Sequence, residues 1–356
     1  MKKHANIPIF VVHMGCPNQC VFCNQRLISG TSSFSAGSVR QQIEQAVETL
    51  AGSGRRAEIA FFGGSFTGIE RPLMRELLDT AQEYVDRGVV QGIRMSTRPD
   101  YIDEEILSIL SRYTVSAVEL GIQSMSDDVL RITKRGHTVE DTYRACRLLR
   151  EAEIPLVGQM MIGLPGASPE DEAHCARKIA AMGACAYRVY PTIVFHGTEL
   201  AEMYERGEYR PLSVEEAVAR MSAVMEILEE KDVYCLRAGL CESDNLHNPD
   251  SFCAGPNHPA IGELARGDLM RRYMERACEA GMTNGTALQG ARVTFFVPVG
   301  KASAAAGQHR GNLLYLRAKY GIKSVKIIEK PEQIGYNIKI DVCPLHERRG
   351  GEIPCV

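Results

Sequence analysis

The chain has 356 residues, of which 45% are hydrophobic and 24% charged, and its formal net charge is −3. These proportions are typical of a globular protein with one large domain and an appendage, or with two domains. The small negative charge gives no overall argument for binding to nucleic acid or membranes, so any basic footprint has to be local. The apolar run 7–12 is too short for a secretory signal, and no stretch approaches a membrane span of roughly 18 apolar residues. The 12 cysteines are therefore expected to be reduced, in a cytoplasmic protein.

The first 240 residues alternate short apolar runs with longer amphipathic stretches. Short runs bounded by turn residues are typical of strands, and apolar positions three or four apart are typical of helices. The predicted strands are 7–14, 57–64, 92–99, 117–124, 155–163 and 186–195. The predicted helices between them are 38–52, 72–88, 103–113, 138–153 and 168–183. This alternation predicts a parallel α/β sheet with right-handed crossovers, in the form of a partial (β/α)6 TIM-like barrel.

A second, smaller module is predicted after a change in composition. A helix is expected over 213–231, and the stretch 244–267 then becomes polar and loop-like. We therefore divide the chain into residues 1–245, a core with its helical extension, and residues 246–356, a small C-terminal α/β module. Its expected elements are a helix near 261–280, a strand over 291–300, a helix over 312–321, and strands over 324–330 and 336–342.

Three cysteines directly follow the first predicted strand. Cys16, Cys20 and Cys23 are spaced C-x3-C-x2-C in the stretch GCPNQCVFC. Three thiolates can bind three irons of a [4Fe–4S] cluster and leave the fourth iron open to another ligand. A zinc site would need a fourth ligand, and the sequence has no second C-x2-C pair. The remaining alternative is a chance group of structural thiols.

Polar residues and glycines lie at the ends of the other predicted strands, or within them. They are Gly63, Gly64, Ser65, Arg98, Glu119, Gln123 and Gly163. Because the carboxyl ends of parallel strands meet at one edge of a sheet, we expect one large active site there, next to the cysteines. Arg98 is a natural partner for a carboxylate. Glu119 in an apolar strand needs a partner, either the hydroxyls of a ribose or Arg98 on the neighbouring strand. Each glycine loop is also consistent with a plain turn.

The cysteine loop resembles that of the radical S-adenosylmethionine (SAM) superfamily. The resemblance implies a [4Fe–4S] cluster on Cys16, Cys20 and Cys23. This cluster would cleave SAM to a 5′-deoxyadenosyl radical, and a flavodoxin or ferredoxin would supply the electron. Phe22 is then expected near the adenine, and Ser65 in FFGGSFTG near the SAM amino group. The residues expected to complete the SAM site are Gly63, Gly64, Arg98, Glu119, Gln123 and Gly163.

The later motifs resemble the catalytic subunit of the Elongator complex and its bacterial relatives. STRPD, VELGIQS, KRGHTVEDT, MIGLPG and RVYPTIVFHGTELAE follow in that family's order within roughly residues 5–245. The resemblance implies modification of a base in transfer RNA. The cysteine spacing is more compact than in Elongator enzymes, and residues 246–356 look different from their acetyltransferase domain. Only the radical half of that chemistry is therefore expected. Lys134, Arg135 and His137 in KRGHT either grip an anionic substrate or belong to a polar loop.

The C-terminal module carries a local positive charge between residues 301 and 330. Its glycine-containing loop, followed by a helix and a strand, resembles a KH unit, which clamps the backbone of single-stranded RNA. The residues predicted to contact RNA are Lys301, Arg310, Arg317, Lys319, Lys323 and Lys326. The alternative is a solvated helix face.

The sequence therefore predicts a radical SAM enzyme that modifies a base in RNA, with transfer RNA as the expected partner. One alternative is a radical enzyme that acts on a small molecule or peptide. Another is a non-catalytic iron–sulfur protein that binds RNA. Cys235, Cys241 and Cys253 are a weaker candidate for a second cluster, because their spacing is irregular.

Overall fold

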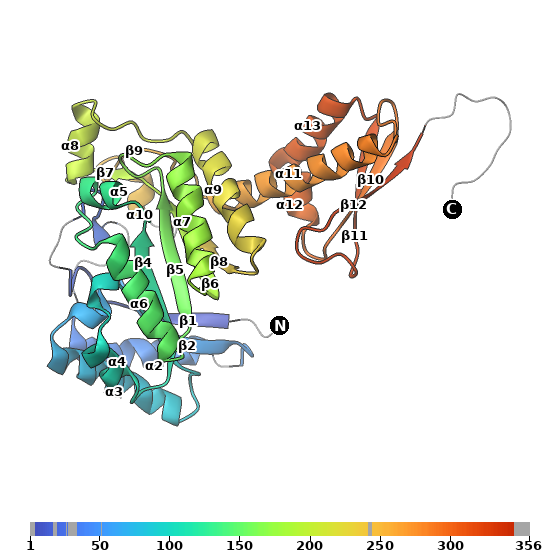
Figure 1. Ribbon diagram of the computed structural model, residues 1–356. Coiled ribbons are helices and arrows are strands. Elements are labelled where there is room, and N and C mark those ends of the chain that lie inside the picture. The colour runs from blue at the N-terminus through green and yellow to red at the C-terminus, as the bar shows by residue number, and fades with distance from the viewer. Residues whose placement is uncertain are drawn as a thin grey trace, which may run out of the picture. The chain divides into compact units, whose positions relative to one another are not determined.

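A computed structural model describes residues 4–16, 20–25, 27, 34–50, 52–240 and 244–344 of the protein. It divides the chain into two compact units, Met1–Pro259 and Ala260–Val356. The division predicted from the sequence, at residue 245, lies before this point. Each unit has its own sheet and its own helices (Figure 1).

The first unit is built on a seven-stranded parallel sheet. Its strands follow one another in chain order: β1 (His4–Phe10), β2 (Arg56–Phe62), β3 (Ile93–Thr97), β4 (Val115–Gln123), β5 (Leu156–Ile162), β6 (Ala186–Pro191) and β8 (Tyr234–Ala238). Because each strand pairs with the one before it, the sheet winds in a single direction and curls into a half-barrel. The predicted partial barrel is confirmed, with β8 as an additional strand.

Helices connect these strands along one face of the curved sheet (Figure 1). They are α2 (Val39–Leu50), α3 (Arg71–Asp86), α4 (Glu104–Leu110), α5 (Asp127–Ile132), α6 (Val139–Glu151), α7 (Pro169–Ala181) and α9 (Val214–Glu229), whereas the short helices α8 (Glu199–Glu205) and α10 (Asp244–His247) follow β7 and β8. Capping boxes start three of them, with Thr138 before α6, Ser168 before α7 and Ser213 before α9. Each cap satisfies backbone N–H groups that would otherwise lack partners, which explains where these helices begin. A short pair of strands, β7 (Val194–Phe195) and β9 (Phe252–Ala254), lies outside the main sheet.

The second unit packs helices on a three-stranded sheet. Its elements are α11 (Ile261–Thr283), β10 (Arg292–Val297), α12 (Ala302–Ala306), α13 (Gly311–Tyr320), β11 (Ser324–Glu329) and β12 (Lys339–Cys343). Strand β10 is central, parallel to β11 and antiparallel to β12. Its alternating residues Val293, Phe295 and Val297 are buried in the core of this unit. No helix in the described part of either unit has the length and apolar composition of a membrane span.

Candidate cofactor site

The cysteine loop leaves the carboxyl end of β1 and is held by hydrogen bonds to the backbone. Cys23 closes a turn by donating its N–H to the carbonyl of Cys20 at 3.0 Å, and Val21 donates to the carbonyl of Thr133 at 3.1 Å. Cys20 is buried, whereas Cys16 and Cys23 are partly exposed, and none of the three forms a disulfide. Residues 17–19 of the loop lie outside the described residues.

The glycine-rich loop after β2 packs closely against the cysteine loop, with direct contacts between the two backbones. Ser65 donates its N–H to the carbonyl of Met14 at 2.9 Å. A Cβ at Gly15 would lie 2.2 Å from the Ser65 carbonyl oxygen, and one at Gly64 would lie 2.5 Å from the Met14 carbonyl oxygen. Gly15 and Gly63 also have positive φ values of 69° and 87°. These glycines are therefore needed for the close approach of the two loops. The contact brings the Ser65 Oγ within 3.1 Å of the Cys16 Sγ.

Arg135 joins the cysteine loop to β4. Its Nη1 donates to the Cys20 Sγ at 3.4 Å, and its Nη2 donates to the carbonyl of Gly121 at 2.9 Å. A Cβ at Gly121 would lie 2.6 Å from that Nη2, so a larger residue at this strand position would displace the guanidinium group from its place. The side chain is buried, and its Nε has no partner among the residues described. The sequence left open whether Arg135 belongs to a polar loop, and the structure places it against a predicted cluster ligand.

Gln123 and Arg98 present further unpaired groups at the ends of β4 and β3. Gln123 is buried with a φ of 64°, a conformation that is strained for a residue other than glycine. Its Oε1 accepts no hydrogen bond from the described chain. Arg98 is 1% exposed, and its Nε and Nη2 donate to Asp100 at 2.9 and 2.8 Å. The remaining Nη1 of Arg98 is buried without a described partner.

His137 is a buried histidine next to this group. Neither ring nitrogen has a hydrogen-bond partner in the described structure, and the residue is 3% exposed. Burial, followed by the positive charge of Arg135, lowers the pKa of His137 to about 3. Asp100 and a polar contact with the backbone of Ile122, which falls short of hydrogen-bond geometry, act in the opposite direction, and Arg98 acts in the same direction, all more weakly than burial. The imidazole is therefore neutral in the folded protein at physiological pH.

The cluster-free protein is expected to lose stability in acid because of His137. Below the ordinary histidine pKa of about 6.5 the unfolded chain binds a proton that the folded chain does not bind. This destabilisation of the folded protein is therefore absent above pH 6.5 and grows as the pH falls towards 3. At pH 5.5 it amounts to about 1.4 kcal/mol. Urea unfolding at pH 7.5 and 5.5 would show this extra loss in the wild type and its absence in His137→Gln. An equal loss in both would contradict the assignment.

The unpaired polar atoms gather around Cys20. Arg135 contacts this thiol, and both Arg98 and Arg135 lie close enough to interact electrostatically with His137. An unpaired buried polar group costs about 1–3 kcal/mol, so several in one place indicate a bound ligand. Guanidinium donors suit a carboxylate, and the Gln123 oxygen suits an ammonium or hydroxyl group. SAM carries all three groups, so these residues fit it.

The thiols fit a cluster better than a single metal ion. Among the described residues, no group of three cysteine, histidine or acidic side chains converges on one ion position. In a [4Fe–4S] cluster each thiolate binds its own iron, so no such convergence is needed. Burial, followed by repulsion from Cys20, raises the pKa of Cys23 to about 12. A thiolate at Cys23 therefore needs the compensating charge of bound iron. Cys241, one of the three cysteines considered for a second cluster, lies outside the described residues.

Glu119 does not lie with the unpaired groups. Its Oε2 accepts from Arg188 at 2.7 Å, and its Oε1 accepts from Arg188 and Arg94 at 3.1 and 3.3 Å. Arg94 also pairs with Glu58 at 2.8 Å. A buried carboxylate with both oxygens engaged has its partners already. Of the two alternatives, the geometry thus favours a salt bridge over a ribose contact. The bridge is formed with Arg94 and Arg188 instead of the predicted Arg98.

Gly163 and Phe22 have mainly packing contacts. Gly163 follows β5, donates its N–H to Glu172 at 2.6 Å, and accepts from the Tyr209 hydroxyl at 2.7 Å. Phe22 is partly buried against an apolar cluster that includes Val194 and Tyr209. A contact of either residue with adenine therefore stays a prediction.

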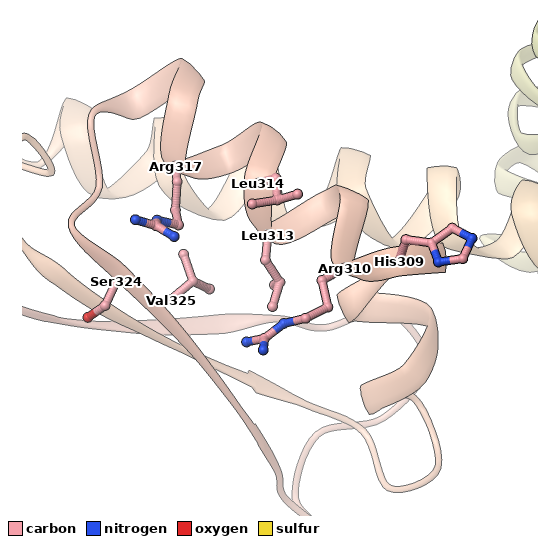
Figure 2. Close-up of a pocket in the computed structure, with 7 residues that line it drawn as sticks. All are labelled: His309, Arg310, Leu313, Leu314, Arg317, Ser324 and Val325. Carbon is pink, nitrogen blue, oxygen red and sulfur yellow. The ribbon is translucent and has the colours of Figure 1, made fainter.

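The six basic residues predicted to bind RNA do not form a single patch. Lys319 lies 2.6 Å from Glu275 and 3.7 Å from Glu279, and Lys301 lies over the ring of Tyr336 at 5.1 Å. Lys323 and Lys326 are exposed. Only Arg310 and Arg317 line a common cavity, between α13 and β11 (Figure 2).

Two family models match the chain. The one described as the Radical SAM superfamily matches residues 10–179, and the one described as the Radical_SAM C-terminal domain matches residues 185–271. The first range contains the cysteine loop and the unpaired groups around Cys20.

Similar proteins occur in archaea and animals. An uncharacterized protein of Methanocaldococcus jannaschii is 31% identical over 246 residues, which are 66% of this chain and 74% of that protein. The tRNA uridine(34) acetyltransferase of Methanocaldococcus infernus is 30% identical over 53% of this chain and 39% of its own length. Human Elongator complex protein 3 is 30% identical over 52% of this chain and 38% of its own length. The chain thus spans well under half of these two longer relatives.

A solved structure has a similar fold. The archaeal Elp3 of Methanocaldococcus infernus, with an N-terminal deletion, matches with a TM-score of 0.58 at 24% identity. The match covers 78% of this chain and 63% of that chain.

Proposed function

Because the chain belongs to the radical SAM superfamily, we propose that it is an enzyme that modifies a base in RNA, with transfer RNA as substrate. Its cofactors are a [4Fe–4S] cluster and SAM. When bound, the cluster supplies the electron that cleaves the sulfonium of SAM. A flavodoxin or ferredoxin is the proposed electron donor. The choice of substrate is supported by relatives named tRNA uridine(34) acetyltransferase, one of which is 36% identical over 137 residues.

Cys16, Cys20 and Cys23 are proposed to hold the cluster. The observation that carries this assignment is the set of buried polar atoms on Arg98, Gln123, Arg135 and His137 that lack partners in the described structure, together with the contact of Arg135 with the Cys20 thiol. A structural zinc site or a chance group of thiols would not need such groups to be left without partners. A SAM molecule next to the cluster would satisfy them.

Arg135 is proposed to bind the carboxylate of SAM, with Gln123 accepting from its ammonium or from a ribose hydroxyl. Arg135 has a free Nε, and Arg98 has a free Nη1. Ser65 touches Cys16 and lies on the loop that shapes the cluster site. Gly63 and Gly64 take part by shaping this loop. In this arrangement SAM is oriented by groups fixed to the ends of β3 and β4.

Replacing Arg135 with glutamine is expected to raise the KM for SAM about 10-fold or more, because a hydrogen bond to a charged group is lost. Arg135→Lys should restore only part of this, since lysine lacks the planar fork of donors. Arg131→Gln is the matched control, because this exposed arginine on α5 pairs only with Asp128. Steady-state formation of 5′-deoxyadenosine against SAM concentration measures all three variants. An unchanged KM for SAM in Arg135→Gln would contradict the proposed contact between Arg135 and the SAM carboxylate.

Nucleoside analysis of transfer RNA from a deletion strain tests the substrate. We expect one modified nucleoside to disappear, and purified enzyme with SAM and a reductant to restore it. Formation of 5′-deoxyadenosine without any change in RNA nucleosides would favour a small-molecule or peptide substrate. Absence of both would contradict the enzymatic proposal.

A further inference from the structure

The second unit contains a groove between α13 and the start of β11, with a cavity volume of about 320 Å³. One wall is the face of α13 that carries Arg310, Leu313, Leu314 and Arg317. Figure 2 shows Arg310, Leu313 and Arg317 directed from the helix towards the strand that carries Val325. Positions 313, 314 and 317 are three or four residues apart, which places them on one helix face, and Arg310 precedes the helix at its N-cap position.

The groove alternates positive charge with apolar surface. Arg310 and Arg317 stand at its two ends, about 10 Å apart along the helix. Leu313 and Leu314 lie between them, and Leu314 is 59% exposed. Neither arginine has a carboxylate partner among the described residues, and no acidic side chain lines the cavity. Lys319 differs, because it is neutralised by Glu275 on α11. The groove is therefore complementary to an anion that also carries an apolar surface.

The loop that enters α13 is held in a strained shape. His309 and Arg310 have φ values of 50° and 60°, in the left-handed region. This conformation costs roughly 1–2 kcal/mol for each residue that is not glycine. Asn312 fixes the loop by donating its Nδ2 to the carbonyl of Ala304 at 3.1 Å. Strain of this kind persists where the surrounding structure imposes it, and it is common at ligand sites.

The amino end of α13 lacks a counter-charge of its own. It has no side-chain cap and no acidic residue in its first turn, and Arg310 occupies the N-cap position. Helices normally place negative charge at this end, because unpaired N–H groups and the helix dipole make it positive. A cation there repels this end of the helix, and a bound anion would offset both charges. The cavity and the uncapped helix end thus point to the same kind of ligand.

We propose that this groove binds a single-stranded segment of RNA, an inference that rests on the proposed RNA substrate. Arg310, with the end of α13, contacts one phosphate, and Arg317 contacts another. An unstacked base between them lies on Leu313, Leu314 and Val325. A duplex would not fit in the same way, because its bases are stacked and their faces are hidden. Strand β11 is an edge strand, so its outer backbone groups are available to the base edge.

Binding of labelled RNA to the full-length protein, measured by fluorescence anisotropy over a range of NaCl concentrations, tests this groove. The probes are a single-stranded oligonucleotide of mixed sequence and a fully paired hairpin of the same length. The double variant Arg310→Gln/Arg317→Gln should bind the single strand roughly 10-fold more weakly. Its slope of log K against log[NaCl] should be shallower by about 1.4, the value for two phosphate contacts. Leu314→Asp, at an exposed position, should also weaken binding.

The control is Lys319→Gln, which removes the same charge from the same helix outside the groove and should change affinity less than twofold. Each groove variant should unfold like the wild type and form 5′-deoxyadenosine from SAM at the wild-type rate without RNA. If the wild type binds RNA and the groove variants bind equally well, or if all prefer the hairpin, the groove assignment is overturned while the RNA substrate stands. If the wild type binds no RNA, both are overturned, and SAM cleavage remains a separate question.

Discussion

Replacing Cys20 with alanine is expected to abolish the formation of 5′-deoxyadenosine from SAM. The thiol is 6% exposed and accepts a hydrogen bond from Arg135, the residue proposed to bind SAM. Its loss leaves two cysteines for a cluster that needs three. Iron content and the visible absorbance of reconstituted protein should fall together with the product, which is quantified by chromatography after reduction.

Cys343→Ala is the matched control for this variant. Cys343 is an exposed thiol at the end of β12, in the second unit, so its removal should leave iron content and product unchanged. A Cys20→Ala protein that keeps its iron and its activity would mean that the cluster is bound elsewhere. Loss of product with full retention of iron would assign Cys20 to SAM binding instead.

Replacing Glu119 with alanine is expected to destabilise the first unit by about 3–5 kcal/mol. The substitution leaves Arg188, 13% exposed, with no carboxylate partner, and leaves Arg94 with Glu58 alone. Uncompensated charges in the interior of the half-barrel account for the predicted loss. Urea unfolding followed by far-ultraviolet circular dichroism measures it.

Glu83→Ala is the control, because Glu83 forms a solvent-exposed salt bridge with Arg40 and its loss should leave the unfolding midpoint unchanged. Glu119→Gln separates the two alternatives for Glu119. A fall in stability with a normal KM for SAM supports the ion pairs in the interior. A raised KM for SAM with normal stability would instead support the contact between Glu119 and a ribose that the sequence predicts.

The repeated strand–helix units could be predicted because their periodicity is strong. All six predicted strands of the first unit overlap β1 to β6. Strand β8 was not assigned because none of its residues is fully buried and Arg237 interrupts the apolar pattern. Helix α12 was read as a loop, since five residues rich in alanine and serine carry no helical periodicity. Short elements at the edges of a fold depend on tertiary contacts more than on local pattern.

The candidate site was predictable where it is local and not where it is assembled from distant segments. The cysteines, Ser65 and Arg98 follow strands and Gln123 ends one, so their shared edge could be inferred. Arg135 lies 115 residues after Cys20, and no sequence pattern shows that the two meet. The sequence feature that comes closest to indicating the position of Arg135 is Gly121, which makes room for its guanidinium group beside β4.

Charge and register explain the remaining differences between sequence and structure. Ser96 of β3 lies opposite Glu119, with Arg94 and Arg98 two residues to either side, and Arg98 is already paired with Asp100, so Glu119 pairs with Arg94. In the second unit, the carboxylates of α11 neutralise Lys319, which the count of positive charges between 301 and 330 could not reveal. Both outcomes depend on which side chains face one another across elements, and composition does not encode this.

The interlocked backbones of the cysteine and glycine-rich loops fix an order of events during biogenesis. Ser65 lies 49 residues after Cys16 and touches it, and the Ser65 turn packs so closely on Gly15 that a Cβ there would lie 2.2 Å from the Ser65 carbonyl oxygen. The thiols therefore take up their positions only after β2 has been synthesised and paired with β1. Iron delivery thus follows folding of the first two strands. A substitution at Gly15 or Gly64 would consequently yield protein that never matures, although every cysteine is intact.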